Sequence, residues 1–186
     1  GVTSFYRVSS SQNVAGRLVA GAQDNASLYY DGTSWSTIFG GDGMDNYLNP
    51  DNDQEVVGGS QYGNFYFSND NGVSNFGIYP NINGEIGEWT TPIIADYVNP
   101  GTLYAGFQNV VKSIDNGNTW TSISNFTTST GVSVELSALA VGVSNPNVLV
   151  AARRVRYEYS EPGTLYVTTN GGTTWNDRTA GIPDSL

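Results

Sequence analysis

Carboxyl groups are the side chains with which this chain could carry out acid–base chemistry. The 186 residues include no histidine and no cysteine, but 17 aspartate and glutamate residues. Thiol nucleophiles, serine–histidine–aspartate triads and metal sites built on imidazole or thiolate are therefore excluded. Bond cleavage catalysed by a pair of carboxyl groups is not excluded. It requires two carboxyl groups that face the same bond and have different pKa values.

One aspartate lies in a glycine-rich segment. Asp42 is flanked by Gly40, Gly41 and Gly43, and Asp45 follows three residues later. Glycines allow the backbone to approach a ligand closely, and loops on a rigid scaffold commonly carry function. We take Asp42 and Asp45 as candidate site residues. An ordinary connection, with Asp42 bonded to its own loop, fits the same pattern.

A short polar element recurs after three apolar runs. Each copy begins with glycine and has glutamine two residues later; the glutamines are Gln23, Gln61 and Gln108, and the next residues are Asp24, Tyr62 and Asn109. Matching positions in repeated units lie on the same edge of each unit. We take the three glutamines as candidate binding residues. Tyr62 is a further candidate, because an exposed ring could stack on a sugar face, although most aromatic residues of the chain should belong to the core.

A second motif predicts a tight turn four times. Residues 113–120 read S-x-D-x-G-x-T-W, and residues 168–175 read the same with asparagine in place of aspartate. Residues 68–74 keep the first seven positions, with Phe76 near the place of the tryptophan, and residues 30–35 are a version one residue shorter. The aspartate can accept backbone N–H groups two and three residues on, the glycine supplies positive φ, and the tryptophan packs beneath the loop. We assign this structural role to Asp31, Asp70, Ser113, Asp115, Gly117, Trp120, Asn170, Gly172 and Trp175.

The same turn could also be compared with a calcium-binding loop. The D-x-[DN]-x-G pattern begins like such a loop, but the carboxylate expected at its twelfth position is missing. We therefore expect no metal site and no cofactor.

The repeats predict an all-β fold. Short β-branched or aromatic runs alternate with glycine- and asparagine-rich turns, and units of about 45 residues with four strands each are typical of β-propeller blades. We expect one propeller segment of about four four-stranded antiparallel sheets, with blades near residues 1–40, 41–90, 91–130 and 131–186. An arc of a larger propeller is favoured, and a closed four-bladed ring is the alternative. Residues 154–159 could extend the last hairpin. Arg153, Arg154 and Arg156 are expected to act as local counter-charges to Glu158 and Glu161.

Charge and hydropathy exclude two classes of partner. The net charge is −10, the pI is about 4.1, and the chain has seven basic residues. Such a chain should not bind nucleic acid through its phosphates or dock on anionic lipid. No apolar run approaches the roughly 18 residues of a membrane span, so we expect no membrane insertion.

The four turns resemble the Asp-box, or BNR, repeat of sialidases, family-74 xyloglucanases, sortilin-type receptors and photosystem assembly factors. The nearer resemblance is to secreted Bacteroidetes propellers known as glycosyl hydrolases with BNR repeats. It rests on residues 17–25, 40–43 and 59–64 and extends over the whole chain. It implies a secreted or cell-surface protein, and it is specific for the blade rather than for an activity.

The resemblance also implies a role for Asp24, because family-74 enzymes carry a catalytic aspartate after the second strand of a blade. Asp24 lacks the glycines of that context, and its counterparts Tyr62 and Asn109 cannot serve as acids. The second acid would be Asp42, Asp45 or a residue of a blade outside these 186 residues. With Asp42 as partner, Asp24 would form the catalytic pair of an inverting glycoside hydrolase, whose carboxyls lie roughly 6.5–9.5 Å apart. We favour a binding or interaction module directed at a polysaccharide or glycoprotein and retain the hydrolase as the alternative. The remaining blades of a larger propeller, or another protein, are further expected partners.

Overall fold

The computed structural model describes residues 3–128 and 130–182, and within them the chain is almost entirely β. Sixteen strands form four four-stranded antiparallel sheets, and the two helical elements are single 3-10 turns, η1 (Gln61–Gly63) and η2 (Tyr157–Tyr159). The first sheet contains β1 (Phe5–Ser10), β2 (Leu18–Ala22), β3 (Ser27–Tyr30) and β4 (Trp35–Phe39). The second contains β5 (Asn46–Leu48), β6 (Val56–Ser60), β7 (Asn64–Ser68) and β8 (Phe76–Ile78).

The second half of the chain repeats this arrangement. The third sheet contains β9 (Ile93–Ala95), β10 (Leu103–Gly106), β11 (Val110–Ser113) and β12 (Thr121–Ser122), and the fourth contains β13 (Ala138–Gly142), β14 (Asn145–Arg153), β15 (Thr164–Thr168) and β16 (Asn176–Asp177). Every sheet runs up and down in chain order. The expected fold class is therefore confirmed, and the outer strand of the second sheet is short but defined.

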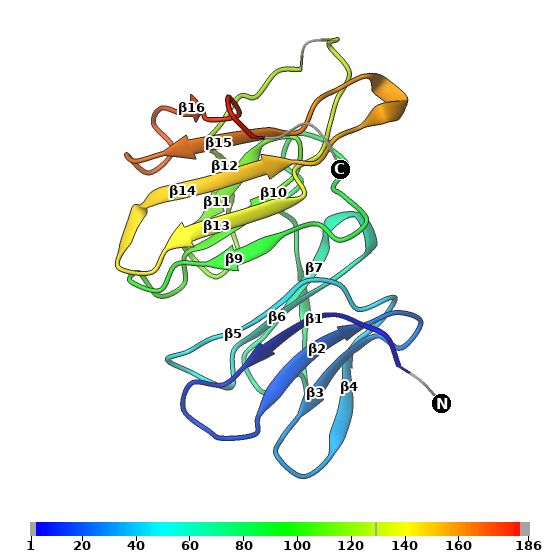
Figure 1. Cartoon of the computed structure of the whole chain (residues 1–186). Helices are drawn as coiled ribbons and strands as arrows, with labels where there is room; N and C mark the ends of the chain where they lie inside the picture. Colours follow the sequence, from blue (N-terminus) through cyan, green and yellow to red (C-terminus); the bar gives the residue numbers. More distant parts are fainter. Residues whose placement is uncertain (1–2, 129, 183–186) are drawn as a thin grey trace.

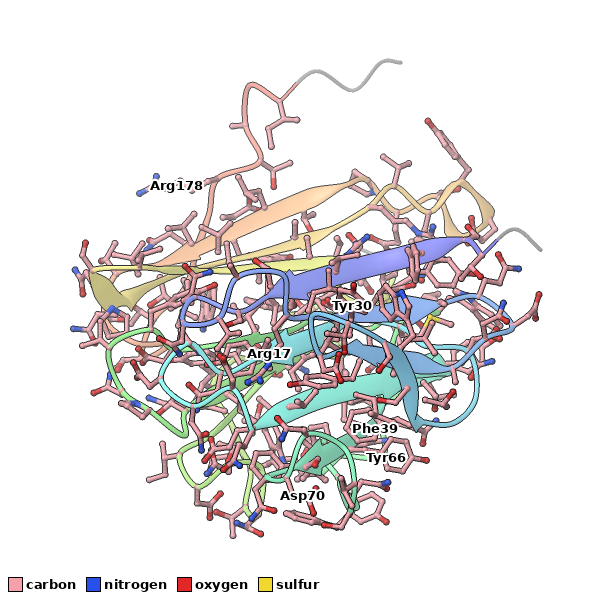
Figure 2. All side chains as sticks on the ribbon, turned by 90° about the horizontal axis from the view of Figure 1, so that it is seen from below. Arg17, Tyr30, Phe39, Tyr66, Asp70 and Arg178 are labelled. Carbon is pink, nitrogen blue, oxygen red and sulfur yellow. The ribbon has the colours of Figure 1, made fainter. Side chains whose placement is uncertain are left out.

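The sheets stack face to face around their first strands. β1 contacts β5, β5 contacts β9, and β9 contacts β13, so the four sheets follow one another as in a propeller arc (Figure 1). An apolar cluster fills each of the three spaces between neighbouring sheets. Between the first two sheets the Phe39 and Tyr66 rings stack with centroids 5.8 Å apart (Figure 2).

The up-and-down order divides the turns between two faces of the molecule. In each sheet the turn between the first two strands (the inner turn) and the turn between the last two (the outer turn) lie at one end, and hydrogen bonds join them, as from Asn116 N–H to Gly101 O (2.9 Å). The middle turns and the connections between sheets lie at the other end. In Figure 1 the turn between β13 and β14 lies to the left and that between β14 and β15 to the right. We call these ends the outer-turn face and the middle-turn face.

Side-chain hydrogen bonds close the outer turns. In the third sheet Asp115 Oδ1 accepts the Ser113 hydroxyl and the Thr119 N–H, both at 2.8 Å, and Asp115 Oδ2 accepts the Thr119 hydroxyl. The N–H lies four residues after the aspartate, and not two or three as the motif suggested. Only the shortened turn of the first sheet has the expected spacing, because Asp31 accepts from Thr33 and Ser34.

The position of the glycine in each outer turn shows which residue corresponds to the tryptophan. Trp35, Trp120 and Trp175 each follow the turn glycine by three residues, and in the second sheet this position belongs to Asn75. Phe76, taken above as the counterpart, instead begins β8 and packs against Phe67. A hydrogen-bonding amide therefore replaces an indole in this sheet.

The segment after β14 also differs from the expectation of a long hairpin. β14 ends at Arg153, a single bridge joins Arg156 to Glu161, and η2 lies between them. Within the described residues, no helix is long and apolar enough to cross a membrane.

Candidate functional site

The candidate site residues lie on the middle-turn face, because the topology brings the middle turns and the inter-sheet connections together there. Asp24 and Tyr62 stand in middle turns, and Asp42 and Asp45 stand in the connection from β4 to β5. Hydrogen bonds join the two kinds of loop, as from Tyr62 N–H to Trp89 O.

Asp24 and Asp42 are neighbours in space. Asp24 is exposed with a φ of 58°, and its backbone N–H donates to Asp42 Oδ1 at 2.8 Å. One carboxylate oxygen of Asp42 is therefore engaged in holding the turn that carries Asp24. The contact brings the two residues of the predicted pair together through backbone and side chain.

Gly43, which follows Asp42, packs against the turn between β2 and β3. A Cβ atom on Gly43 would collide with the backbone of Ala26 and Ala22, and the Gly43 N–H donates to Ala22 O at 3.0 Å. A Cβ atom on Gly21 would collide with the backbone of the same connection. The close backbone approach that these glycines permit is to the turn between β2 and β3.

Asp45 lies deeper than the sequence alone suggested. Its Oδ1 accepts the Asn46 N–H at 3.0 Å and its Oδ2 accepts the Ile93 N–H at 3.2 Å. Burial raises the pKa of this carboxyl, against the smaller opposing effect of these hydrogen bonds. Asp45 thus joins the first strands of the second and third sheets.

Two exposed aromatic rings stand on the same face. The Tyr62 and Trp89 rings meet edge to face with centroids 5.3 Å apart, and their side chains are 52% and 39% exposed. The Trp89 Nε1–H donates to the Tyr6 hydroxyl at 3.3 Å, which links the connection before β9 to the first strand of the first sheet. Tyr62 itself has a φ of 62°, a left-handed conformation that is uncommon in residues other than glycine.

A network of charges lies beside these rings. Glu88 is buried, and its Oε1 contacts Arg156 Nη2 and lies 2.9 Å from Arg154 Nη2. The same Arg156 nitrogen lies 2.8 Å from Glu135 Oε2, and Nη1 lies 3.5 Å from Glu158. A buried carboxylate requires such partners, because an unpaired charge in this place would be costly.

The rings and the charges line an open cavity of about 290 Å³ on the middle-turn face. Its walls are Tyr62, Ile86, Gly87, Glu88, Trp89, Glu135, Arg154 and Arg156. This volume lies just below the range of about 300–1,000 Å³ for small-molecule sites. Sequence reasoning named Tyr62 but missed Glu88, Trp89 and Glu135, and it paired the arginines with Glu158 and Glu161. Of these pairings, the structure contains the Arg156–Glu158 ion pair, at 3.5 Å.

The three glutamines take part in this face through their backbone carbonyl groups. The backbone carbonyls of all three accept hydrogen bonds: Gln23 from Asn25, Gln61 from Asn64 and Gln108 from Arg153. The Arg153 guanidinium lies between loops, with Phe126 and Tyr166 each 5.7 Å from its centre. Among the described residues, no group of three or more acidic side chains is placed to hold a metal ion.

Comparison with known proteins shows the fold. No family model and no curated protein matches the chain. Three solved structures are similar: an ancestral GH74 enzyme (15% identity, TM-score 0.75), the GH74 enzyme of Niastella koreensis (20%, 0.68) and the GH74 xyloglucanase of Xanthomonas campestris (18%, 0.72). They match 97%, 92% and 94% of this chain, which spans 26%, 29% and 30% of theirs. At these identities the likeness establishes that the chain is an all-β propeller segment.

Proposed function

We propose that this chain is a segment of a secreted or cell-surface Asp-box propeller that binds a neutral glycan on its middle-turn face. The observation that carries the proposal is the Tyr62–Trp89 ring pair, which lines a cavity together with charged groups. Exposed aromatic rings present an apolar face on which a sugar can stack, while carboxylates and guanidinium groups bond its hydroxyls.

The charge of the chain selects among glycans. A net charge of −10 repels polyanions, so a neutral polysaccharide is favoured over a uronate- or sulfate-bearing one. The Asp-box assignment draws on the hydrogen bonds of the outer turns, where a carboxylate or amide bridges the loop in every sheet. The GH74 neighbours suggest xyloglucan oligosaccharides as the first probe.

The alternative function is that of an inverting glycoside hydrolase with Asp24 and Asp42 as the catalytic pair. Their adjacency supports it. Binding is preferred because Asp42 already accepts the Asp24 N–H and both oxygens of Asp45 accept backbone groups. A carboxylate held in this way is a turn stabiliser, whereas an acid catalyst needs a carboxyl that can donate its proton to the substrate.

Isothermal titration calorimetry with xyloglucan and cello-oligosaccharides tests binding, because its signal does not depend on the tryptophans that the variants replace. We expect Trp89→Ala to weaken affinity at least about tenfold, through loss of stacking and of the cavity wall. Trp35→Ala is the matched control, because Trp35 is also about half exposed but lies on the first sheet away from the cavity. No binding to any neutral glycan, or equal affinities of the two variants, would contradict the proposal.

The same oligosaccharides test the alternative. We expect no new reducing ends on prolonged incubation with the chain. Hydrolysis that Asp24→Asn abolishes and Trp35→Ala leaves unchanged would establish the enzyme in place of the binding module.

A further inference from the structure

A contact between a glycine and an isoleucine recurs at all three interfaces between sheets. The outer-turn glycine of one sheet packs on an isoleucine of the sheet before it: Gly72 on Ile38, Gly117 on Ile78 and Gly172 on Ile123. A Cβ atom at Gly117 or Gly172 would lie 2.9 Å from the isoleucine side chain. In each case the isoleucine follows the glycine of its own sheet by six residues.

A side-chain donor accompanies this contact. Three residues after the glycine, Trp175 donates its Nε1–H to the carbonyl of Ile123 at 2.7 Å, and Asn75 donates its amide to the carbonyl of Ile38 at 3.4 Å. In the third sheet, Trp120 packs into the apolar cluster instead and bonds its own turn. We call the sheet that supplies the glycine the receiving sheet. Each receiving sheet thus has a glycine that contacts the isoleucine and, three residues later, a side chain with a hydrogen-bond donor; we call the place of this side chain the donor position.

The first sheet has a glycine, Gly32, and a tryptophan, Trp35, at the same two positions. In the described part of the chain, no isoleucine of another sheet packs against this glycine. Among the described residues, no heavy atom lies within 4 Å of the place of a Cβ on Gly32. Trp35 occupies the donor position and is 48% exposed, stacked on Phe5. Val8, on the face of the sheet turned away from the second sheet, is 56% exposed. This face is therefore built like the three receiving faces that are covered.

We propose that the first sheet receives another four-stranded sheet of the same repeat. The fourth strand of that sheet would place a branched aliphatic side chain against Gly32 and a backbone carbonyl opposite Trp35 Nε1. Continuity with the three existing interfaces supports this occupant. The solved propeller chains, of which this chain spans 26–30%, are long enough to include further sheets. The proposal concerns assembly and is independent of the glycan.

A second copy of this chain fits the first sheet less well. Six residues after Gly172 stands Arg178, which is exposed and projects away from the molecule (Figure 2). The fourth sheet of another copy would bring this guanidinium to the place where three interfaces have an isoleucine. Burying a charge beside the Trp35 and Phe5 rings without an acceptor would be costly.

Thiol labelling tests the proposal, because the chain has no cysteine of its own. Val8→Cys reports on the uncovered face, and Val73→Cys, on an outer turn and 86% exposed, is the matched control. Both variants are made in the 186-residue chain and in the polypeptide at the full length that its gene encodes. Circular dichroism checks folding, and acrylamide quenching of Trp35, by difference with Trp35→Phe, gives a second measurement should Val8→Cys fail to fold.

We expect dithiobis(nitrobenzoate) to react with both thiols at similar rates in the 186-residue chain. In the full-length polypeptide Val8→Cys should react at least about a hundredfold more slowly, because labelling then requires local opening, while Val73→Cys is unchanged. Equally fast reaction of Val8→Cys in both proteins would overturn the proposal. Protection in the 186-residue chain that increases with its concentration would also overturn it, in favour of a second copy.

Discussion

At the scale of single residues, one short polar side chain closes each outer turn. Asp70 and Asp115 accept a hydroxyl and an N–H with the same oxygen, and Asn170 does so with its amide oxygen. Asn170 also donates its Nδ2–H to the Thr174 hydroxyl, a bond in the opposite direction to that at the aspartates. The turn therefore needs an oxygen acceptor at this position, and negative charge is an addition that brings pH dependence.

Acid pH tests this addition. The Thr33 hydroxyl and the Ser34 and Thr33 N–H groups lower the pKa of Asp31 from 3.8 to about 2, and the pKa values of Asp70 and Asp115 are lowered for similar reasons. A carboxyl with a lowered pKa in the folded state stabilises the fold above its unfolded pKa. This stability is lost as pH falls from about 4 toward about 2.

We therefore expect the melting temperature to fall with acidification across this range. Replacing all three aspartates by asparagine should flatten the profile there while preserving the turns, as Asn170 does in the fourth sheet. Melting temperatures measured by circular dichroism from pH 5 to pH 2 provide the check. An unchanged pH profile in the triple variant would show that other carboxyls cause the acid sensitivity.

At the scale of the elements, the position of a sheet in the stack determines what the same motif residue contributes. Trp120 and Trp35 hold equivalent places in their turns. Trp120 packs on the cluster between the second and third sheets and donates to Gly117 O at 2.9 Å, whereas Trp35 is 48% exposed. The motif is local, but the area that it buries depends on the neighbouring sheet.

Paired alanine substitutions test this difference. Trp120→Ala should lower the free energy of unfolding by about 3 kcal/mol, the lower end of the range for a large buried aromatic, because part of the indole is accessible. Trp35→Ala should cost less than about 1 kcal/mol in the 186-residue chain. Urea unfolding of both variants measures the two costs, and equal costs would contradict the interpretation.

At the scale of the whole molecule, the strands of the middle sheets are more deeply buried than those of the fourth sheet. The second and third sheets have a neighbour on each side, and β10 and β11 are almost wholly buried. In the fourth sheet, the corresponding third strand β15 is mostly half-buried. Local opening is easier where fewer apolar contacts cover a strand.

Hydrogen exchange should reveal this order. We expect the amides of β6, β7, β10 and β11 to exchange most slowly, and those of β15 to exchange faster than those of the equivalent β11. Exchange followed by mass spectrometry on peptides from each strand gives the comparison. Uniform protection across the four sheets would mean that they open as one cooperative unit.

The sequence by itself was sufficient for the fold because the interactions that define it are local. Alternating apolar residues, tight turns and the repeated S-x-D-x-G-x-T-W segment act within about ten residues, so four sheets of four strands follow from pattern alone. The positions of Asp24, Asp42 and Tyr62 on one face follow as well, because each sheet alternates direction. The residue that replaces the tryptophan in the second sheet could not be predicted in this way. Asn75 and Phe76 are adjacent in sequence, and only the hydrogen-bonding register of the folded turn shows that Asn75 takes the position.

The tertiary structure decided which side chains meet across sheets. Glu88 and Arg156 are 68 residues apart in sequence, and Trp89 meets Tyr6 over 83 residues, so no local pattern marks them as partners. The burial of Asp45 and the contacts of Gly72, Gly117 and Gly172 likewise depend on the spacing between stacked sheets. These contacts arise because side chains from separate blades share one confined space, and its shape is set only when the sheets pack.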